Sequence, residues 1–145
     1  MTAPPAPPSG IRLADSQRVA WLRLIRSENV GPSTFLELIK RYGTATRALD
    51  ALPELAAQGR GRQIRIASQE DAERELHHLH QIKARVICLG EPDYPPALRA
   101  ADAPPPVLTV MGNSQILLCN SVAVVGSRNA SLSGKKLTRQ FATAL

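Results

Sequence analysis

The sequence is poor in aromatic residues and has no long apolar run. Aromatic side chains make up only 3% of the 145 residues, whereas 43% are hydrophobic, so the core must consist of aliphatic side chains and alanine. No stretch approaches the ~18 apolar residues that a membrane-spanning helix needs. The N-terminus also lacks the charged and apolar segments of a secretory signal. We therefore expect a cytoplasmic protein with no membrane partner.

Cysteine is scarce, and acidic residues are absent from the C-terminal segment. Cys88 and Cys119 lack the C-x-x-C spacing of a metal or redox site, which is typical of buried, reduced thiols in the cytosol. No acid follows Asp102, and the whole chain carries a net charge of +6. This distribution favours a polyanion as the partner. The cations of the C-terminal segment are Arg128, Lys135, Lys136 and Arg139.

Residues 1–10 contain four prolines and almost no apolar anchor, which predicts a disordered tail. Residues 11–84 have helical periodicity and predict a small, all-helical domain. Its first helix is expected to begin with Asp15 or Ser16 as N-cap and to end near Asn29. The apolar face of this helix combines Val19, Ala20, Leu22, Leu24 and Ile25.

Proline and glycine delimit the next two helices. Pro32 suits the first position of a second helix, and Gly43 suits the position after its end. A third helical pattern spans residues 44–58, and Pro53 is expected to divide it into two turns.

A fourth helix is expected to follow Ser68, which can cap it, and to run from residue 69 to about residue 83. His77 and His80 share one face of this helix. No carboxylate or cysteine completes a ligand set with them, so no metal site is expected. The residues expected to face inward are Ala72, Leu76, Leu79 and Ile82.

A Val-Gly-Pro turn between the first two helices is typical of a helix-hairpin-helix unit. The hairpin amides and the following helix N-terminus can hold a nucleic-acid phosphate, so Gly31 and Ser33 are candidate secondary contacts. A plain helical corner fits the same residues. A basic loop over residues 59–62 offers Arg60 and Arg62 as further candidates, with a solvated loop as the alternative.

Residues 85–145 predict the opening of an α/β domain. Strands are expected over residues 85–89, 107–111 and 122–125, with a turn segment and one helical turn between the first two. The four apolar residues over 122–125 are typical of a strand buried on both faces, which favours a parallel sheet. The boundary with the helical domain is expected near residue 84.

A loop of small residues follows the last expected strand and leads into a basic helix that continues to Leu145. Gly126 ends the strand, and Arg128 can hold a phosphate through two parallel hydrogen bonds. The helix start adds unpaired amides and the positive end of its dipole. The candidate phosphate-binding residues are Gly126, Ser127, Arg128, Asn129, Ser131 and Lys135.

Two common nucleotide-binding motifs are absent from this loop. The Rossmann fingerprint G-x-G-x-x-G fails because Arg128 stands where the second glycine would be. The P-loop fails because Asn129 stands five residues before Gly134, and because Lys136 replaces the metal-binding hydroxyl. The loop therefore predicts phosphate binding without catalysis or a cofactor. Close packing of strand on helix is the alternative explanation for its small residues.

The run Val-Ala-Val-Val-Gly-Ser-Arg-Asn over residues 122–129 resembles the G-S-R motif of the DNA-processing protein A family (DprA, also called Smf). Residues 93–98 and 104–108 resemble the approach to that motif. The helical part resembles the sterile-alpha-motif-like (SAM-like) domain at the N-terminus of the family. The resemblance covers roughly residues 11–145.

This resemblance implies a protein that binds single-stranded DNA during natural transformation and recombination and loads the RecA recombinase onto it. It also implies an extended Rossmann-type sheet without a nucleotide cofactor, and a homodimer in the intact family. Arg128 matches the arginine that contacts DNA phosphate, together with Gly126 and Ser127. Because the chain stops at Leu145, one helix after the motif, we expect a fragment with an incomplete sheet and reduced activity.

Two other functions remain open on the residues alone. A Rossmann-like nucleotide hydrolase would need an acidic catalytic motif after the loop, and the sequence has none. A protein-interaction module would use the helical domain over residues 11–84 by itself.

Overall fold

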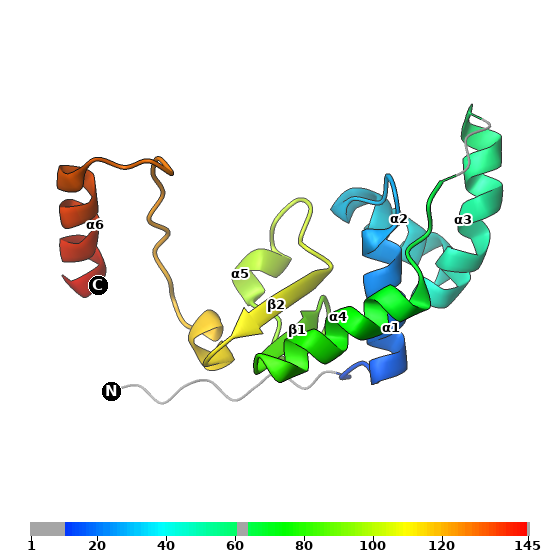
Figure 1. The fold of residues 1–145 in the computed structure, drawn as a ribbon, viewed down its shortest axis with the longest axis horizontal. Coiled ribbons are helices and arrows are strands. Elements are labelled where there is room, and N and C mark those ends of the chain that lie inside the picture. The colour runs from blue at the N-terminus through cyan, green and yellow to red at the C-terminus, as the bar shows by residue number, and fades with distance from the viewer. Residues whose placement is uncertain (1–10, 61–63, 145) are drawn as a thin grey trace.

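The computed structural model of the chain describes residues 11–60 and 64–144. The predicted tail over residues 1–10 and the candidate contact Arg62 lie outside the described residues. Figure 1 shows the helices of residues 15–81 gathered beside a small sheet, with the last helix set apart from them. In chain order the elements are α1 (Asp15–Arg26), α2 (Pro32–Tyr42), α3 (Ala45–Arg60), α4 (Gln69–Gln81), β1 (Ala84–Cys88), α5 (Pro96–Arg99), β2 (Val107–Met111), the 3-10 helix η1 (Ser114–Leu118) and α6 (Leu132–Ala144).

The predicted limits of α2 and the start of α4 are confirmed. Pro32 is the first residue of α2, and Gly43 ends it with a φ of +80°, a conformation that favours glycine. Ser68 caps α4, because its Oγ accepts a hydrogen bond from the Asp71 amide at 3.0 Å. These limits depend on side chains within a few positions of the helix end, which is why they can be read from sequence.

Helix α1 begins at Asp15, one of the two expected starts, but the predicted N-cap residue is wrong. Ala14 is the N-cap and has no side chain that could accept a hydrogen bond. The Gln17 side chain compensates by accepting a hydrogen bond from the Ala14 amide at 2.8 Å. Asp15 therefore lies in the first turn, where its negative charge interacts favourably with the helix dipole.

Pro53 does not divide the third helix, since α3 is continuous from Ala45 to Arg60. Proline removes one backbone hydrogen bond from a helix interior. Leu49 and Leu52 before the proline are buried in the main core, and Leu55 after it packs against the same core. Arg60, which was expected in a basic loop, is instead the last residue of α3.

Ile82 does not face inward as predicted, since 40% of it is exposed. Helix α4 ends at Gln81, and Lys83 then turns the chain with a φ of +56°. Ile82 lies beyond the helix, so the helical periodicity that predicted its inward position does not apply to it. The other three predicted inward residues, Ala72, Leu76 and Leu79, are buried.

The main core lies among α1, α2 and α3. The Trp21 ring of α1 packs against the Phe35 ring of α2, with centroids 4.9 Å apart and planes tilted by 57°. Phe35 is fully buried. Because the chain has few aromatic residues, this ring fills a large share of the core volume. The buried members of this helical core are Leu24, Val30, Phe35, Leu38, Ala45, Ala48, Leu49 and Leu52.

The expected parallel sheet is wrong for its first two strands. Strands β1 and β2 pair antiparallel, with Ala84 opposite Met111 and Cys88 opposite Val107. A parallel pair needs a crossover of a dozen or more residues, usually a helix. Helix α5 has only four residues, and Gly90, at a φ of +98°, reverses the chain directly after β1.

The third expected strand is also absent from the described residues. Residues 122–125 form no strand, and Val125 is 91% exposed. A strand exists only where a neighbouring strand supplies hydrogen-bond partners, and the described sheet contains β1 and β2 alone.

A second, smaller cluster joins the helices to the sheet. Leu22, Ala72 and Leu76 from α1 and α4 are buried there, and Val86 and Val107 from the two strands pack against them. The strand pair thus lies on the side of α1 away from the main core. Within the described residues, no helix combines the length and apolar character needed to cross a membrane.

Replacing Phe35 by alanine is expected to destabilise the protein by about 3–5 kcal/mol, because it removes a fully buried ring and leaves a cavity beside Trp21. Urea unfolding followed by circular dichroism measures this change. Val125→Ala is the control, and it should stay within about 0.5 kcal/mol of the parent. A loss below about 1 kcal/mol for Phe35→Ala would contradict the core described above.

Candidate nucleic-acid interface

The predicted phosphate-binding loop lies on an exposed stretch between η1 and α6. Gly126, Ser127, Arg128 and Asn129 are all exposed, and residues 128–129 form a turn. In Figure 1 this stretch runs away from the sheet and then reverses into α6. The loop therefore presents its backbone and side chains to solvent.

Ser131 organises the start of α6. Its Oγ accepts a hydrogen bond from the Gly134 amide at 3.1 Å, and its carbonyl accepts one from the Lys135 amide at 2.9 Å. A Cβ on Gly134 would lie 3.4 Å from that Oγ, at the short limit of ordinary van der Waals contact. Ser131 thus acts as a helix cap through an oxygen lone pair, and its O–H can still donate to another group.

An open hollow of about 460 Å³ lies between the loop and α6. It brings Gly126 and Ser127 of the loop together with Lys135 of the helix, which the sequence analysis predicted as parts of one site. Arg128 and Asn129 are not among the residues that line it. The structure adds Arg139, which lies four positions after Lys135 and so on the same helix face.

The cations of this region have no acidic neighbour. Among the described residues, none of Arg128, Lys135 or Arg139 takes part in an ion pair. The sequence explains this, since the acids of the chain all precede residue 103. Their charge is therefore available to an external anion.

The hairpin between α1 and α2 forms the other predicted contact. Asn29 adopts a φ of +61°, and the Gly31 carbonyl accepts the first α2 hydrogen bond, from Phe35 at 2.8 Å. No side chain caps this start of α2, and Gly31 and Ser33 are exposed. The first amides of α2 are consequently free to bind an anion.

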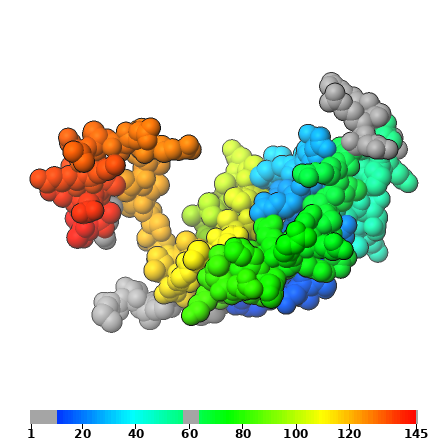
Figure 2. Space-filling model, in the orientation of Figure 1, coloured from blue at the N-terminus to red at the C-terminus, as the bar shows by residue number. Residues whose placement is uncertain are grey.

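The structure does not bring the two candidate contacts together. Figure 1 shows the loop and α6 at one end of the molecule and α2 with α3 at the other. Figure 2 shows the same separation in space-filling form, with only a narrow connection between α6 and the remaining mass. Each contact must therefore be considered by itself.

Neither cysteine forms part of a reactive site. Cys88 is fully buried, and burial, reinforced by the negative charge of Glu91, raises the pKa of its thiol to about 12. Cys119 is exposed and is a free thiol. In the part of the chain that the structure describes, no group of three or more His, Cys, Asp or Glu side chains could hold a metal ion.

A helical hairpin unit followed by a basic glycine turn defines a two-part chain with anion-binding features in each part. The family model described as the DprA-like N-terminal HHH domain matches residues 15–77, which include the hairpin. The model described as DNA recombination-mediator protein A matches residues 85–145, which include the loop. The chain belongs to the DprA family of DNA-processing and recombination proteins. No curated protein matches the chain.

A thiol-reactive reagent at pH 8 is expected to modify Cys119 and to leave Cys88 unmodified in the folded protein. The folded pKa of Cys88 lies above the unfolded value of about 8.5, so the neutral thiol stabilises the fold at lower pH. That contribution is lost as the pH rises toward 12. Mass spectrometry should therefore find one adduct before unfolding and two after it. A Cys119→Ser variant that still gains an adduct when folded would contradict the burial of Cys88.

Proposed function

We propose that the chain binds single-stranded DNA through the loop over residues 126–131 and the first turns of α6. In this proposal it acts in natural transformation and recombination, with the RecA recombinase as its protein partner. The observation that carries the proposal is the exposed Arg128, unpaired among the described residues, in a segment without acids. Membership of the DprA family supports the same conclusion.

The chemistry of the loop fits a sugar-phosphate backbone better than a base. Phosphate oxygens accept hydrogen bonds from guanidinium, hydroxyl and amide donors, all of which the loop presents in Arg128, Ser127 and Asn129. Lys135 and Arg139 add two further positive charges along the adjoining face of α6. Contacts of this kind give affinity that depends on salt and little on sequence.

The hairpin is a second, weaker part of the proposed interface. Its free amides at the start of α2 can donate hydrogen bonds to a phosphate, but the neighbouring side chains contribute no positive charge between Gly31 and Glu37. We infer that it contacts DNA without dominating the affinity. The proposed activity is binding rather than catalysis, because positioning a backbone needs no proton transfer or nucleophile.

Arg128→Glu is expected to weaken binding to a single-stranded oligonucleotide by at least about tenfold at low salt, since it replaces a phosphate donor by a repelling carboxylate. Arg128→Ala should lower the slope of log affinity against log salt by about 1. Fluorescence anisotropy over a salt series measures both.

Arg47→Glu is the matched control, because it changes the net charge equally on the exposed surface of α3, away from the loop. It should weaken binding only by the small effect of total charge. Equal losses for Arg128→Glu and Arg47→Glu would refute the proposed site.

Ser33→Asp is expected to stabilise the fold by roughly 0.3–1 kcal/mol, because a carboxylate in the first turn of α2 interacts favourably with the helix dipole. The same charge should weaken DNA binding by roughly threefold to tenfold, because it occupies the anion position of the hairpin. Thr46→Asp is the control, since Thr46 holds the equivalent second position of α3. An unchanged affinity for Ser33→Asp would exclude the hairpin from the interface.

A further inference from the structure

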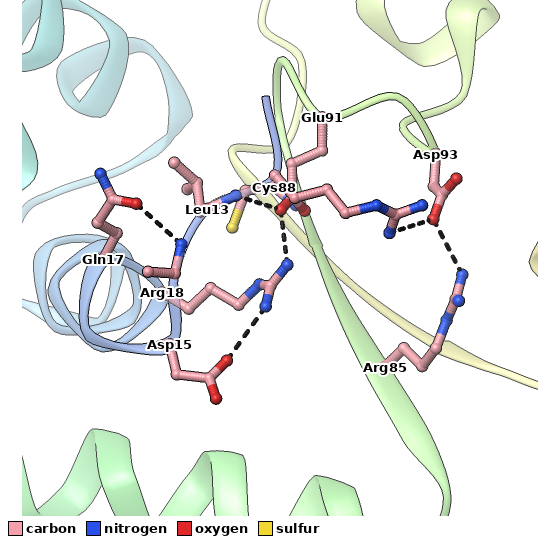
Figure 3. A network of polar contacts seen from close by, with 10 residues as sticks. Leu13, Asp15, Gln17, Arg18, Arg85, Cys88, Glu91 and Asp93 are labelled. Atoms are coloured by element: carbon pink, nitrogen blue, oxygen red, sulfur yellow. Dashed lines mark hydrogen bonds and ion pairs between the residues drawn. The ribbon is translucent and has the colours of Figure 1, made fainter. Parts of the chain in front are cut away.

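Glu91, in the loop after β1, connects three parts of the fold through one buried carboxylate. Only 3% of this residue is exposed. Its Oε1 accepts hydrogen bonds from the Leu13 amide at 2.8 Å and from Arg18 Nη2 at 2.7 Å, and its Oε2 accepts one from the Cys88 amide at 2.8 Å. Figure 3 shows these contacts meeting where the segment before α1, α1 itself and the end of β1 come together. We refer to Leu13, Arg18, Cys88 and Glu91 as the Glu91 junction.

A second buried carboxylate lies beside the junction. Asp93 is 4% exposed, and its Oδ2 lies 2.8 Å from Arg12 Nη1 and 3.3 Å from Arg85 Nη2. Arg12 precedes α1, whereas Arg85 belongs to β1. Arg85 also donates a hydrogen bond to the Ser114 hydroxyl of η1. Asp93 therefore repeats the same link between the start of the helical part and the strand pair.

The Arg18 guanidinium keeps its charge although it is partly buried. Burial lowers the pKa of Arg18, but the hydrogen bond and the attraction to Glu91 outweigh that effect and raise it above its ordinary value. Arg18 therefore stays charged, and its Nη2 lies 2.7 Å from Glu91 Oε1. Removing one member of a buried pair leaves an uncompensated charge, which costs much more than the intact pair contributes.

The two parts that the junction joins differ in how far each can fold alone. The main core lies within residues 20–66 and includes no residue of the sheet. The strand pair, in contrast, has two strands and rests on the small cluster around Leu22 and Leu76. An isolated two-stranded sheet is at best marginally stable in water. The strand pair consequently depends on its attachment to α1.

We infer that the Glu91 junction is an interdomain lock that holds the strand pair closed on the helical part. When the lock is broken, the strand pair opens locally while the core of α1, α2 and α3 remains folded. This inference uses no property of the DNA-binding loop and is independent of the proposed function.

Hydrogen exchange of the full chain, read peptide by peptide, tests the lock. In Glu91→Gln, amides of β1 and β2 are expected to exchange at least about tenfold faster, because their opening no longer requires breaking a buried ion pair. Amides of α2 and α3 should change by less than about twofold. Equal acceleration in both parts, or no acceleration in the strands, would overturn the inference.

Two further variants keep the test decisive. Arg18→Lys retains the charge but not the guanidinium geometry. It should accelerate exchange selectively in β1 and β2, by about threefold. This variant still tests the lock if Glu91→Gln fails to fold. Glu75→Gln is the control, because it breaks the Arg26–Glu75 pair, which joins α1 to α4 within the helical part. Selective exchange in the strands of Glu75→Gln would show that the effect is not specific to the junction, and would overturn the lock.

Discussion

The fold depends on the packing of α1, which buries two opposite faces. Leu22 and Leu24 are both fully buried, yet they lie two positions apart, and a helix turns by about 200° over two residues. Leu24 enters the main core with α2 and α3, whereas Leu22 enters the smaller cluster with α4 and the strands. One twelve-residue helix therefore holds the helical part and the sheet in a single arrangement. The two buried carboxylates then add directional contacts at the same place.

Charge is used in two contrasting ways along the chain. Near α1, carboxylates and guanidinium groups are paired, and the carboxylates of Glu91 and Asp93 are almost fully buried. Beyond residue 102 no acid is present, so the cations of the loop and α6 stay unneutralised by their surroundings. Paired charges specify geometry, whereas unpaired exposed charges attract a polyanion. This division agrees with membership of a family of DNA recombination mediators.

The C-terminal segment also differs in its packing. Helix α6 has no buried residue in the described structure, and Val122 and Val125 are exposed where a buried strand was expected. The candidate loop is thus accessible on several sides. Ser131 and Gly134 still define its local shape, because the helix cap requires only neighbouring residues. The proposed phosphate contacts can form without any rearrangement of the helical part.

Local features were predictable from the sequence, and long-range ones were not. Pro32, Gly43 and Ser68 mark helix limits correctly because caps and turns depend on neighbouring residues. The basic loop without acids and the family resemblance could also be identified from the sequence. The pairing of β1 with β2, the unpaired residues 122–125 and the two-sided burial of α1 were decided by tertiary structure. The Glu91 junction is the clearest case, since Leu13 and Glu91 are 78 positions apart and only folding brings the amide to the carboxylate.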